Sequence, residues 1–350
     1  MSRIPVTILG ATGVVGQRFV RRLQNHPLFE IQHLAASDRS TGKKYETACA
    51  WRVDGEPHGG LGDRVLGAPH PSETYSPVVF SALDSGPASE IEPLFAAAGS
   101  LVFSNASAFR MAADVPLLVP EANADHLGLI ETQRKARGWK GAIVCNPNCT
   151  ATVLVMGLAP LQQAFGIERV FMTSMQAISG AGYPGVPSLD IMGNVIPFIK
   201  NEEEKVEEET PKMLGRFAAG AVLPAPFSIS AMCHRVPVLE GHSEAVSVTL
   251  RGNPSVDAVR EAFRSWRGDA RVSGLHSAPE VPIRVHAVEN RPQVRLDVER
   301  DGGMSVHVGR VRPCPLLGVK FALLGHNTER GAAGASVLNA ELAHAMGYLG

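Results

Sequence analysis

Short apolar runs separated by helix-like stretches organise the first half of the chain. The runs lie at residues 4–9, 31–35, 78–80, 101–103 and 142–145. Continuous apolar runs of this length are typical of strands buried on both faces, as in a parallel sheet. Because helix-like stretches such as 17–25 and 88–98 follow the strands, the pattern predicts a doubly wound α/β domain.

The second half of the chain has a different order of elements. A helix-like run at 151–165 comes first, an amphipathic helix is expected at 255–267, and a final helix is expected at about 335–346. Strands are predicted at 170–176, 228–238, 244–250, 294–298, 305–311 and 319–324, the second and third of them antiparallel. Because strands and helices no longer alternate, we expect an α+β domain packed on the first domain.

Composition and charge fit a globular enzyme and exclude several other classes. Lys and Arg total 33 against 34 Asp and Glu, so no surface for nucleic acid or an anionic membrane is expected. No apolar run approaches the roughly 20 residues that span a bilayer, and the N-terminus runs into a strand pattern without a cleavable signal. The five cysteines are scattered without a C-x-x-C pair, so neither a disulfide framework nor a metal site is predicted. We therefore expect a reduced, cytoplasmic enzyme.

A glycine-rich turn follows the first strand. Gly10, Gly13 and Gly16 stand in the series Gly-Ala-Thr-Gly-Val-Val-Gly, between the strand at 4–9 and a helix. In this form of the dinucleotide fingerprint the first glycine allows a tight turn, the second lets the backbone approach a pyrophosphate, and the third permits close helix–strand packing. A glycine pattern alone is weak evidence. Its position between a strand and a helix predicts a dinucleotide site.

The residues after the second strand bear on the choice of dinucleotide. Ser37, Arg39, Ser40 and Lys43 offer hydroxyl groups and cations suited to a ribose 2′-phosphate. Asp38 argues for NAD, because an acidic side chain at this place binds the free 2′-hydroxyl. The excess of donors and cations favours NADP.

Cys149 is the candidate nucleophile. It follows Asn146-Pro-Asn148, a group of turn formers between an apolar strand and the helix-like run. At a helix N-terminus, unpaired N–H groups and the helix dipole favour a thiolate. The same N–H groups could stabilise an oxyanion on a carbon bonded to the sulfur. The alternative is a small buried cysteine in a strand-to-helix turn.

Three further features have both a chemical and a structural interpretation. His242 follows a glycine at a strand boundary, where an imidazole could serve a nucleophilic cysteine, although spacing alone favours a structural histidine. Arg110 lies between two strand ends on the ligand side of the sheet, yet a lone arginine in a loop is usually solvated. The acidic cluster at 202–209 has helical spacing and by default forms a solvated helix face with i,i+3 and i,i+4 ion pairs.

Taken together, these motifs resemble those of the aspartate-semialdehyde dehydrogenases. The motifs are the glycine series 10–16, Asn-Pro-Asn-Cys149-Thr, Gln176 ahead of Ser-Gly-Ala-Gly, Glu202-Glu-Glu-Lys205, and Arg235 seven residues before His242. The series Ser-x-Arg-Ser-x-Gly-Lys and Asn-Thr-x-Arg-Gly-Ala-Ala-Gly is most similar to the archaeal and fungal branch. The resemblance covers essentially the whole chain.

The resemblance implies a domain organisation and an assembly. We expect an NADP-binding Rossmann-type domain at 1–148, a catalytic and oligomerisation domain at 149–328, and a C-terminal helix at 329–350 that returns to the first domain. A homodimer or homotetramer is also implied. Glu329 departs from the family pattern, in which we expect an uncharged residue before Arg330.

The resemblance also implies roles for individual residues. Cys149 would be the nucleophile, His242 the acid/base, and Gln176 a residue that positions the acyl group. The implied substrate-binding residues are Arg235 for the α-carboxylate, Glu202 for the α-ammonium, Arg110 and Lys205 for the phosphate, and Asn148. The implied cofactor-binding residues are Gly10, Thr12, Gly13, Val14, Val15, Gly16, Ser37, Arg39, Ser40, Lys43, Ser81, Ser179, Gly180, Gly182 and Asn327. Only the three-residue offset to Lys205 selects Glu202 over Glu203 and Glu204.

The implied reaction is the NADPH-dependent reductive dephosphorylation of 4-phospho-L-aspartate to aspartate semialdehyde through a Cys149 thioester. It would serve the biosynthesis of lysine, threonine, methionine and isoleucine. One alternative is a related acyl reductase, such as a malonyl-CoA reductase or an N-acetyl-glutamyl-phosphate reductase, over which Glu202 with Lys205 favours an amino-acid acyl phosphate. A second is a cysteine hydrolase or transferase, which has no use for the glycine fingerprint. A third is a non-catalytic NADP-binding protein, which has no need of Cys149 with His242.

Overall fold

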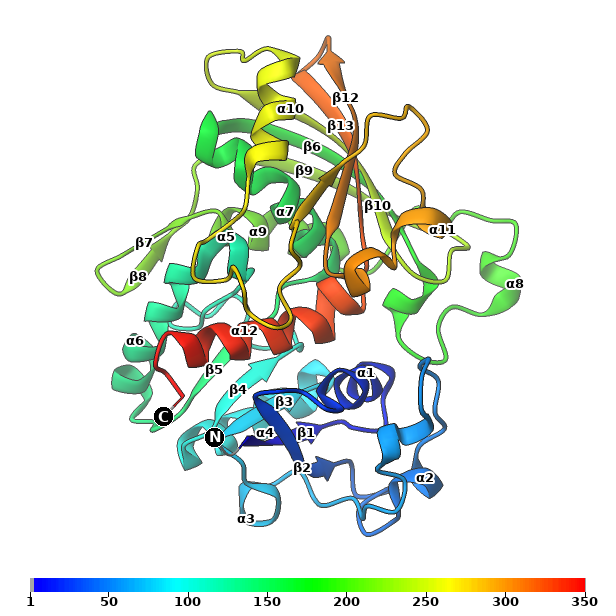
Figure 1. Cartoon of the computed structure of the whole chain (residues 1–350), viewed down its shortest axis with the longest axis vertical. Helices are drawn as coiled ribbons and strands as arrows, with labels where there is room; N and C mark the ends of the chain where they lie inside the picture. The colour runs from blue at the N-terminus through cyan, green and yellow to red at the C-terminus, as the bar shows by residue number, and fades with distance from the viewer. Residues whose placement is uncertain (1–2, 350) are drawn as a thin grey trace.

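The computed structural model describes residues 3–349, and its N-terminal body is built on a five-stranded parallel sheet (Figure 1). The strands are β1 (Ile4–Leu9), β2 (Phe29–Ala35), β3 (Val78–Ser81), β4 (Leu101–Ser104) and β5 (Ala142–Cys145), in the order β2-β1-β3-β4-β5. The predicted α/β fold is confirmed. Because the chain goes from β1 to β2 on one side and to β3 on the other, the strand order reverses at β1, which is where such sheets bind ligands.

Both faces of this sheet are covered, as the continuous apolar runs require. Val78 and Phe80 pack with helix α1 (Val14–Leu23) and with the C-terminal helix α12 (Gly334–Ala345). The intervening Val79 packs with Phe95 of α4 (Ser85–Ala98) on the opposite face. Helix α12 therefore returns from the end of the chain to the first sheet, as Figure 1 shows in red.

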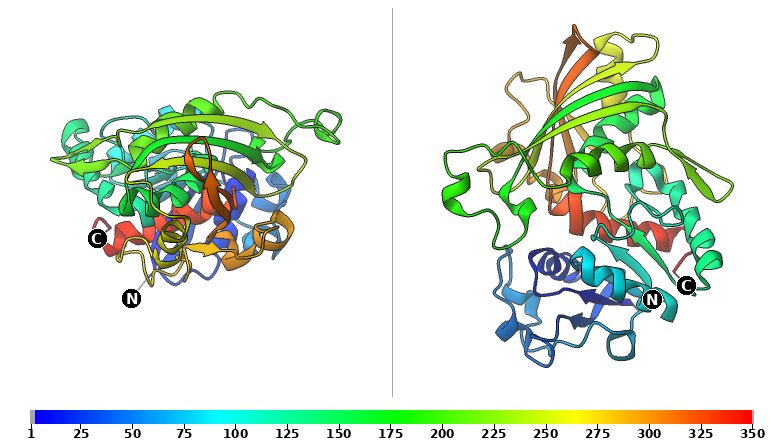
Figure 2. Two further views of the ribbon diagram at one scale, coloured as in Figure 1. Left: turned by 90° about the horizontal axis from the view of Figure 1, so that it is seen from above. Right: turned by 180° about the vertical axis from the view of Figure 1, so that it is seen from behind.

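The second body contains a six-stranded mixed sheet in the order β11-β12-β13-β10-β6-β9. The strands are β6 (Ile167–Gln176), β9 (Ser228–Arg235), β10 (His242–Leu250), β11 (Ile283–Val285), β12 (Val306–Cys314) and β13 (Gly318–Gly325). Strands β9 and β10 run in opposite directions as predicted, but they do not pair. Strand β6 lies between them, parallel to β9 and antiparallel to β10. In the view from behind, this sheet lies in front of its helices (Figure 2).

The remaining elements connect and cover the two sheets. They are α2 (Tyr45–Ala48), α3 (Pro71–Thr74), α5 (Pro120–Asn123), α6 (Leu129–Arg137), α7 (Cys149–Ala164), α8 (Ser188–Ile191), α9 (Glu202–Met213), α10 (Val256–Ser265), α11 (Val294–Asp297), and the hairpin of β7 (Arg216–Ala218) and β8 (Ala221–Leu223). Helix α7 is buried along most of its length and packs against both α9 and the six-stranded sheet. Within residues 3–349, no helix is long and apolar enough to cross a membrane.

The strand predicted at 294–298 is wrong, because this segment forms the short helix α11. The carboxylate of Asp297 accepts a hydrogen bond of 2.8 Å from the backbone N–H of Gln293 and is paired with the guanidinium of Arg291. Side-chain bonds of this kind give the backbone a local alternative to a sheet ladder. The apolar alternation of the segment could not reveal them.

A buried carboxyl group under the first sheet makes stability depend on pH. Glu92 of α4 is fully buried, accepts a hydrogen bond of 2.7 Å from Ser104 Oγ, and has its pKa raised by burial to about 7. Ser104 Oγ in turn accepts from the N–H of Ala106, in the loop that follows β4. The folded protein therefore prefers the protonated acid.

The wild type should become less stable as pH rises, and we expect Glu92→Gln not to show this decrease. A carboxyl whose folded pKa lies above its unfolded value contributes full stability below the unfolded pKa and loses it as pH rises through the folded pKa. From about pH 5 to pH 8 the wild type should lose about 2–3 kcal/mol that the variant keeps. The measurement is the thermal midpoint of both proteins across this range. Glu90→Gln, on the exposed side of the same helix, is the control, and equal pH slopes in all three proteins would contradict the prediction.

Candidate active site

The cavity that contains Cys149 lies where the two bodies meet. Its volume is about 420 Å³, and elements of both bodies line it. The lining residues are Val15, 82–85, 105–107, Arg110, 147–149, 179–182, Glu202, Lys205, Asn327, Thr328, Gly331 and Ala332. The carboxyl ends of β3, β4 and β5 all lead into it, as expected for ligand sites in open α/β sheets.

The glycine-rich turn has the geometry that a dinucleotide needs. Gly10 has φ +72°, and a Cβ there would lie 2.7 Å from the carbonyl oxygen of Ala82. A Cβ at Gly16 would collide with the carbonyl oxygen of Gly10, so the third glycine lets α1 pack on the strand. At Gly13 nothing lies closer than 3.4 Å to such a Cβ, and the residue is exposed. The second glycine therefore leaves the backbone open to a ligand at the N-terminus of α1.

The predicted 2′-phosphate loop is an exposed turn after β2. The backbone N–H of Ser40 donates to the carbonyl of Ser37 at 2.8 Å, and the N–H of Lys43 donates to that of Ser40 at 3.1 Å. Arg39 and Lys43 are exposed. Among the described residues neither has an ion-pair partner, so both cations are free to meet an anion.

The predicted Ser81 lies just short of the cavity. It ends β3 and is buried, while the lining begins one residue later, at Ala82. Our sequence reasoning did not select 82–85 or 105–107. The rule that ligands bind at the carboxyl ends of parallel strands could have found them.

Cys149 is the first residue of α7. The side chain of Asn148 caps the helix by accepting a hydrogen bond of 3.0 Å from the N–H of Ala151. A Cβ at Gly331 would lie 2.6 Å from Cys149 Cβ, so the absence of a side chain there makes room for the nucleophile. The sulfur lies 3.2 Å from Nε2 of His242. The structure thus brings together two residues that are 93 positions apart.

The hydrogen bonding of His242 determines where its proton lies. Nδ1 accepts a hydrogen bond of 3.1 Å from the backbone N–H of Ala177. A neutral imidazole has one donor and one acceptor nitrogen, so the proton is on Nε2 and faces the sulfur of Cys149. In this tautomer the ring is placed to donate a proton.

Burial shifts the pKa of each member of the pair toward its uncharged form, which is opposite to the direction that the helix N-terminus predicts for Cys149. Burial, assisted by the charge of Glu202, raises the pKa of the Cys149 thiol to about 12. Burial and the nearby Arg235 lower the pKa of His242 to about 3. The helix N-terminus favours the thiolate, but desolvation outweighs it here.

Gln176 and Arg235 lie beside the pair. Gln176 ends β6, is buried, and donates from Nε2 to Ser174 Oγ at 3.0 Å. Arg235 ends β9 and donates from Nη1 to the carbonyl of Ala177 at 2.6 Å. A Cβ at Gly180 would lie 2.8 Å from Nη1 of Arg235 and 3.2 Å from the His242 ring. The glycine therefore leaves space at these two side chains.

One face of helix α9 forms a wall of the site, so the expected solvated face is wrong for this side of the helix. Glu202 is buried and accepts hydrogen bonds from Asn148 Nδ2 at 2.9 Å and Thr150 Oγ1 at 3.1 Å. Lys205 lines the cavity, and no ion-pair partner for its ammonium occurs within residues 3–349. Among described residues, α9 has none of the expected internal ion pairs.

The neighbours of Glu202 point elsewhere. Glu203 accepts a hydrogen bond of 2.8 Å from the N–H of Cys233, and Glu204 is exposed. Of the three candidates, only Glu202 lines the cavity. Glu208 is exposed as expected, but Glu207 accepts a hydrogen bond of 2.8 Å from the N–H of Ala231 and holds α9 against β9.

Sequence reasoning missed two residues further along the same face. Glu209 is buried and accepts from Arg110 Nη1 at 3.1 Å and from the N–H of Asn148 at 2.6 Å. Lys212 donates to the carbonyls of Arg110 at 2.6 Å and Ala112 at 2.8 Å. Arg110 is therefore a buried residue of the cavity wall, not a solvated one. The spacing of 202, 205, 209 and 212 on one helix face was the available signal.

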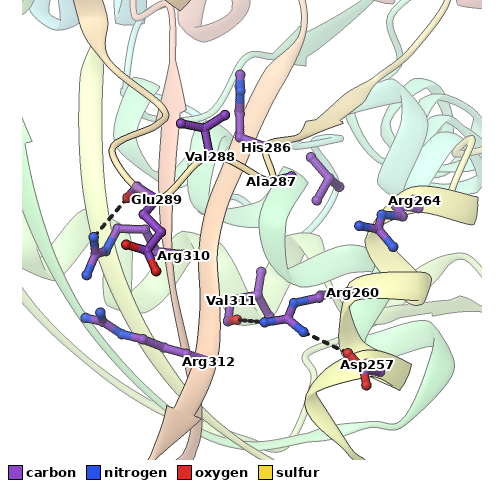
Figure 3. A pocket seen from close by; sticks show the side chains of 11 residues that line it. Asp257, Arg260, Arg264, His286, Ala287, Val288, Glu289, Arg310, Val311 and Arg312 are labelled. Carbon is purple, nitrogen blue, oxygen red and sulfur yellow. Dashed lines mark hydrogen bonds and ion pairs between the residues drawn. The ribbon is translucent and has the colours of Figure 1, made fainter.

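A second groove, of about 410 Å³, lies away from the cysteine between α10 and the β11–β12 edge (Figure 3). It has four arginines, but Arg310 and Arg312 extend to the opposite side of the strand from Arg260 and Arg264. Arg260 donates to Asp257 at 2.7 Å and to the carbonyl of Val311 at 2.8 Å. These guanidinium groups do not converge on one point.

Metal-type ligands gather once in the described part of the chain, at His286, Asp297 and His307. His286 Nε2 and His307 Nδ1 already share a hydrogen bond of 3.0 Å. Asp297 is occupied by Arg291 and by the N–H of Gln293. The cluster lies outside the residues that line the Cys149 cavity.

Comparisons with known proteins agree with this geometry. A family model for the NAD binding domain of semialdehyde dehydrogenases matches residues 5–130, and one for their dimerisation domain matches residues 158–330. The chain is 50% identical over 342 residues to the aspartate-semialdehyde dehydrogenase of Methanothermobacter thermautotrophicus, covering 97% of this chain and 98% of that protein. Identity to the Saccharomyces cerevisiae enzyme is 43% over 352 residues, covering 96% of each.

A solved structure has the same fold over nearly the full length. The aspartate-semialdehyde dehydrogenase of Candida albicans, crystallised with NADP, superimposes with a TM-score of 0.91 at 42% identity, covering 98% of this chain and 99% of that one. By sequence, domain models and structure, the chain belongs to the aspartate-semialdehyde dehydrogenase family.

Proposed function

We propose that this chain reduces 4-phospho-L-aspartate to L-aspartate 4-semialdehyde with NADPH, releasing phosphate, as a step in the biosynthesis of lysine, threonine, methionine and isoleucine. The observation that carries the proposal is the Cys149 Sγ to His242 Nε2 distance of 3.2 Å, beside a cavity that also reaches the N-terminal end of α1 at Val15. A nucleophile and a proton donor thus adjoin a dinucleotide-type turn. A hydrolase would not need that turn, and a binding protein would not need the pair.

The residues fit NADP. The open backbone at Gly13 and the N-terminus of α1 would hold the pyrophosphate, and Arg39 and Lys43 would meet the 2′-phosphate. Ser179, Gly180, Gly182 and Asn327 line the cavity near Cys149 and would form the wall at its nicotinamide end. The cofactor supplies the hydride when bound.

Cys149 performs the acyl transfer. Its sulfur bonds to the β-carbonyl carbon of the substrate, the bond from that carbon to the phosphate oxygen breaks, and a thioester results. The thiol proton leaves with the phosphate. The step therefore needs neither a thiolate in the resting enzyme nor an unprotonated Nε2 on His242 to accept that proton. The N–H groups at the start of α7 lie next to Cys149 and could stabilise the oxygen on the carbon bonded to its sulfur.

His242 serves the second step. Its Nε2–H donates a hydrogen bond to the oxygen that develops charge when the thioester is reduced, and the proton stays with the imidazole when the C–S bond breaks. The aldehyde is then released and the sulfur departs as a thiolate, which takes one proton from solvent to become a thiol again. The Ala177 N–H, which donates to Nδ1 at 3.1 Å, keeps the ring in the required tautomer throughout.

Four charged residues recognise the substrate in this proposal. Arg235 presents a fork suited to the α-carboxylate, and Glu202 offers a carboxylate to the α-ammonium. Arg110 and Lys205 supply positive charge for the leaving phosphate. Glu202 with Lys205 favours an amino-acid acyl phosphate over an acyl-CoA substrate.

We propose that the open face of the six-stranded sheet joins two copies of the chain. Phe171, Met175 and Met232 are 40%, 39% and 48% exposed on strands β6 and β9, and the view from behind shows the sheet in front of its helices (Figure 2). Apolar side chains on an open sheet favour association.

All five cysteines are free thiols, which suits a reducing cytoplasm.

The purified chain should reduce NADP in the presence of aspartate semialdehyde and phosphate, and it should depend on both. Cys149→Ala should lower kcat/KM by more than about a thousandfold, because the loss of an essential nucleophile removes several powers of ten. The initial rate of NADPH formation at 340 nm measures both the dependence on the two substrates and the effect of the substitution. Cys145→Ala, at a buried cysteine of β5, should cost far less. A faster reaction with malonate semialdehyde and coenzyme A would contradict the substrate assignment.

Alkylation of Cys149 in the free enzyme should accelerate with pH over the whole accessible range. Because burial raises the thiol pKa to about 12, the thiolate fraction should grow about tenfold per pH unit from roughly pH 6 to 9. The rate of iodoacetamide modification, followed by mass spectrometry of the Cys149 peptide, reports this fraction. A plateau beginning near neutral pH would mean that a thiolate–imidazolium pair is the resting state.

Arg39→Ala should weaken NADP binding by about tenfold, the effect of losing one charge-assisted contact, and should leave NAD nearly unaffected. Titration calorimetry with each dinucleotide measures the two affinities. Lys44→Ala is the control, since Lys44 is a neighbouring exposed cation that pairs with Asp63 at 2.5 Å. If Arg39→Ala weakens the binding of NADP and NAD equally, Arg39 does not contact the 2′-phosphate, and Asp38 becomes the candidate ligand of the ribose.

A further inference from the structure

Glu240 lies two residues before His242 and joins four segments of the fold. Its Oε1 accepts a hydrogen bond of 2.6 Å from Nη2 of Arg18, in helix α1 of the first body. Its Oε2 accepts from Ser179 Oγ at 2.8 Å and from Thr328 Oγ1 at 3.1 Å. One carboxylate therefore links α1, the turn at 178–181, the segment before α12, and the loop that leads to His242.

Around this carboxylate the hydrogen bonds close into a ring. Ser179 Oγ donates to Glu240 and accepts from Asn327 Nδ2 at 2.8 Å. Asn327 Oδ1 accepts from the N–H of Gly241 at 2.7 Å, and Gly241 follows Glu240 in the chain. Both ends of the Asn327 amide are thereby fixed. Ser179 and Asn327 line the cavity, whereas Glu240 does not.

Arg18 holds this ring from outside and has a second carboxylate partner. Its Nη1 donates to Oε1 of Glu329 at 2.7 Å, and Nε of Arg22 donates to Oε2 of Glu329 at 2.6 Å. The side chains of Arg18 and Glu329 are 10% and 5% exposed. Partly buried charge-assisted hydrogen bonds are stronger and less screened than surface pairs. Glu329, which departs from the family pattern, thus serves to anchor Arg18.

The arrangement connects two parts of the cavity that the chain itself keeps far apart. The N-terminus of α1 is the predicted pyrophosphate site, and Arg18 lies just over one turn into that helix. Ser179 and Asn327 form the predicted nicotinamide wall in the second body. Arg18 and Glu240 form a direct side-chain contact between them, at a distance typical of a strong ion pair.

We propose that Arg18 and Glu240 are positioning residues, which hold the Ser179–Asn327 wall in register with α1 so that both ends of a bound dinucleotide meet one rigid unit. The inference rests on the proposed function, since it takes NADP as the ligand. It concerns neither Cys149 nor the proton of His242. Removing the contact should weaken the binding of the nicotinamide half of the ligand and leave the binding of the adenine half unchanged.

The test compares NADP with 2′-phospho-ADP-ribose, which has the adenine, the 2′-phosphate and the pyrophosphate but no nicotinamide. The variants are Glu240→Gln, Arg18→Met and the double variant. In Glu240→Gln, Arg18 keeps its pair with Glu329. In Arg18→Met, Glu329 keeps Arg22, and Glu240 keeps only its hydrogen bonds from Ser179 and Thr328. We expect each to weaken NADP by about tenfold, as for loss of one charge-assisted bond, and 2′-phospho-ADP-ribose by less than about twofold. Calorimetry of the full chain gives the affinities.

Two further measurements separate positioning from simple stabilisation. The double variant should lose little more NADP affinity than either single variant, because both remove the same contact. The rate of Cys149 alkylation should be unchanged in all three. As controls, Asp257→Asn and Arg260→Met remove an exposed ion pair of 2.7 Å on α10, away from the cavity. These substitutions should alter the affinity for neither ligand.

Three results would overturn the inference or its basis. If the variants weaken both ligands equally, the contact stabilises the fold without positioning the wall. If the variants bind both ligands as the wild type does, the contact has no bearing on the cofactor. A wild-type chain that binds neither ligand would instead refute the proposed function, which the first two results leave intact.

Discussion

The chemistry of this site depends on the backbone of one residue, Ala177. Its N–H donates to Nδ1 of His242 at 3.1 Å, which places the imidazole proton on the nitrogen that faces Cys149. Its carbonyl accepts from Arg235 at 2.6 Å. Because Ala177 directly follows β6, the register of that strand with β9 and β10 positions the proton donor and the guanidinium together. Both contacts are made by main-chain atoms of residue 177, and the Ala177 side chain takes no part in them.

Features that depend on contiguous residues could be predicted from the sequence. The glycine turn, the parallel sheet and the Asn148–Cys149 helix start are all local patterns with local causes, and the structure has them. The raised pKa of the Cys149 thiol could not be predicted, because it depends on how deeply the folded chain buries the sulfur. Likewise the helix α11 forms because Asp297 bonds to Gln293 and Arg291, a choice that apolar alternation does not express.

Helix α9 shows why a charge pattern is ambiguous until its neighbours are known. Its acidic cluster has the composition of a solvated face, yet Glu202 and Glu209 are buried against the start of α7. What distinguishes them is a partner far away in the sequence, the turn at Asn148. The family resemblance selected Glu202 and Lys205, but Glu209 and Lys212 were missed. The latter two hold Arg110 and its loop and are recognisable only from their contacts.

The neutral Cys149–His242 pair suits a substrate that carries its own negative charge. A resting thiolate beside Glu202 would oppose both the burial of the site and the approach of an acyl phosphate dianion. A thiol avoids this opposition, and the proton it loses during attack is the one that the departing phosphate needs. In the proposed reaction, desolvation would therefore couple formation of the nucleophile to departure of the leaving group. On this argument the raised pKa of Cys149 is compatible with the proposed reaction, because the leaving phosphate accepts the proton that the thiol loses.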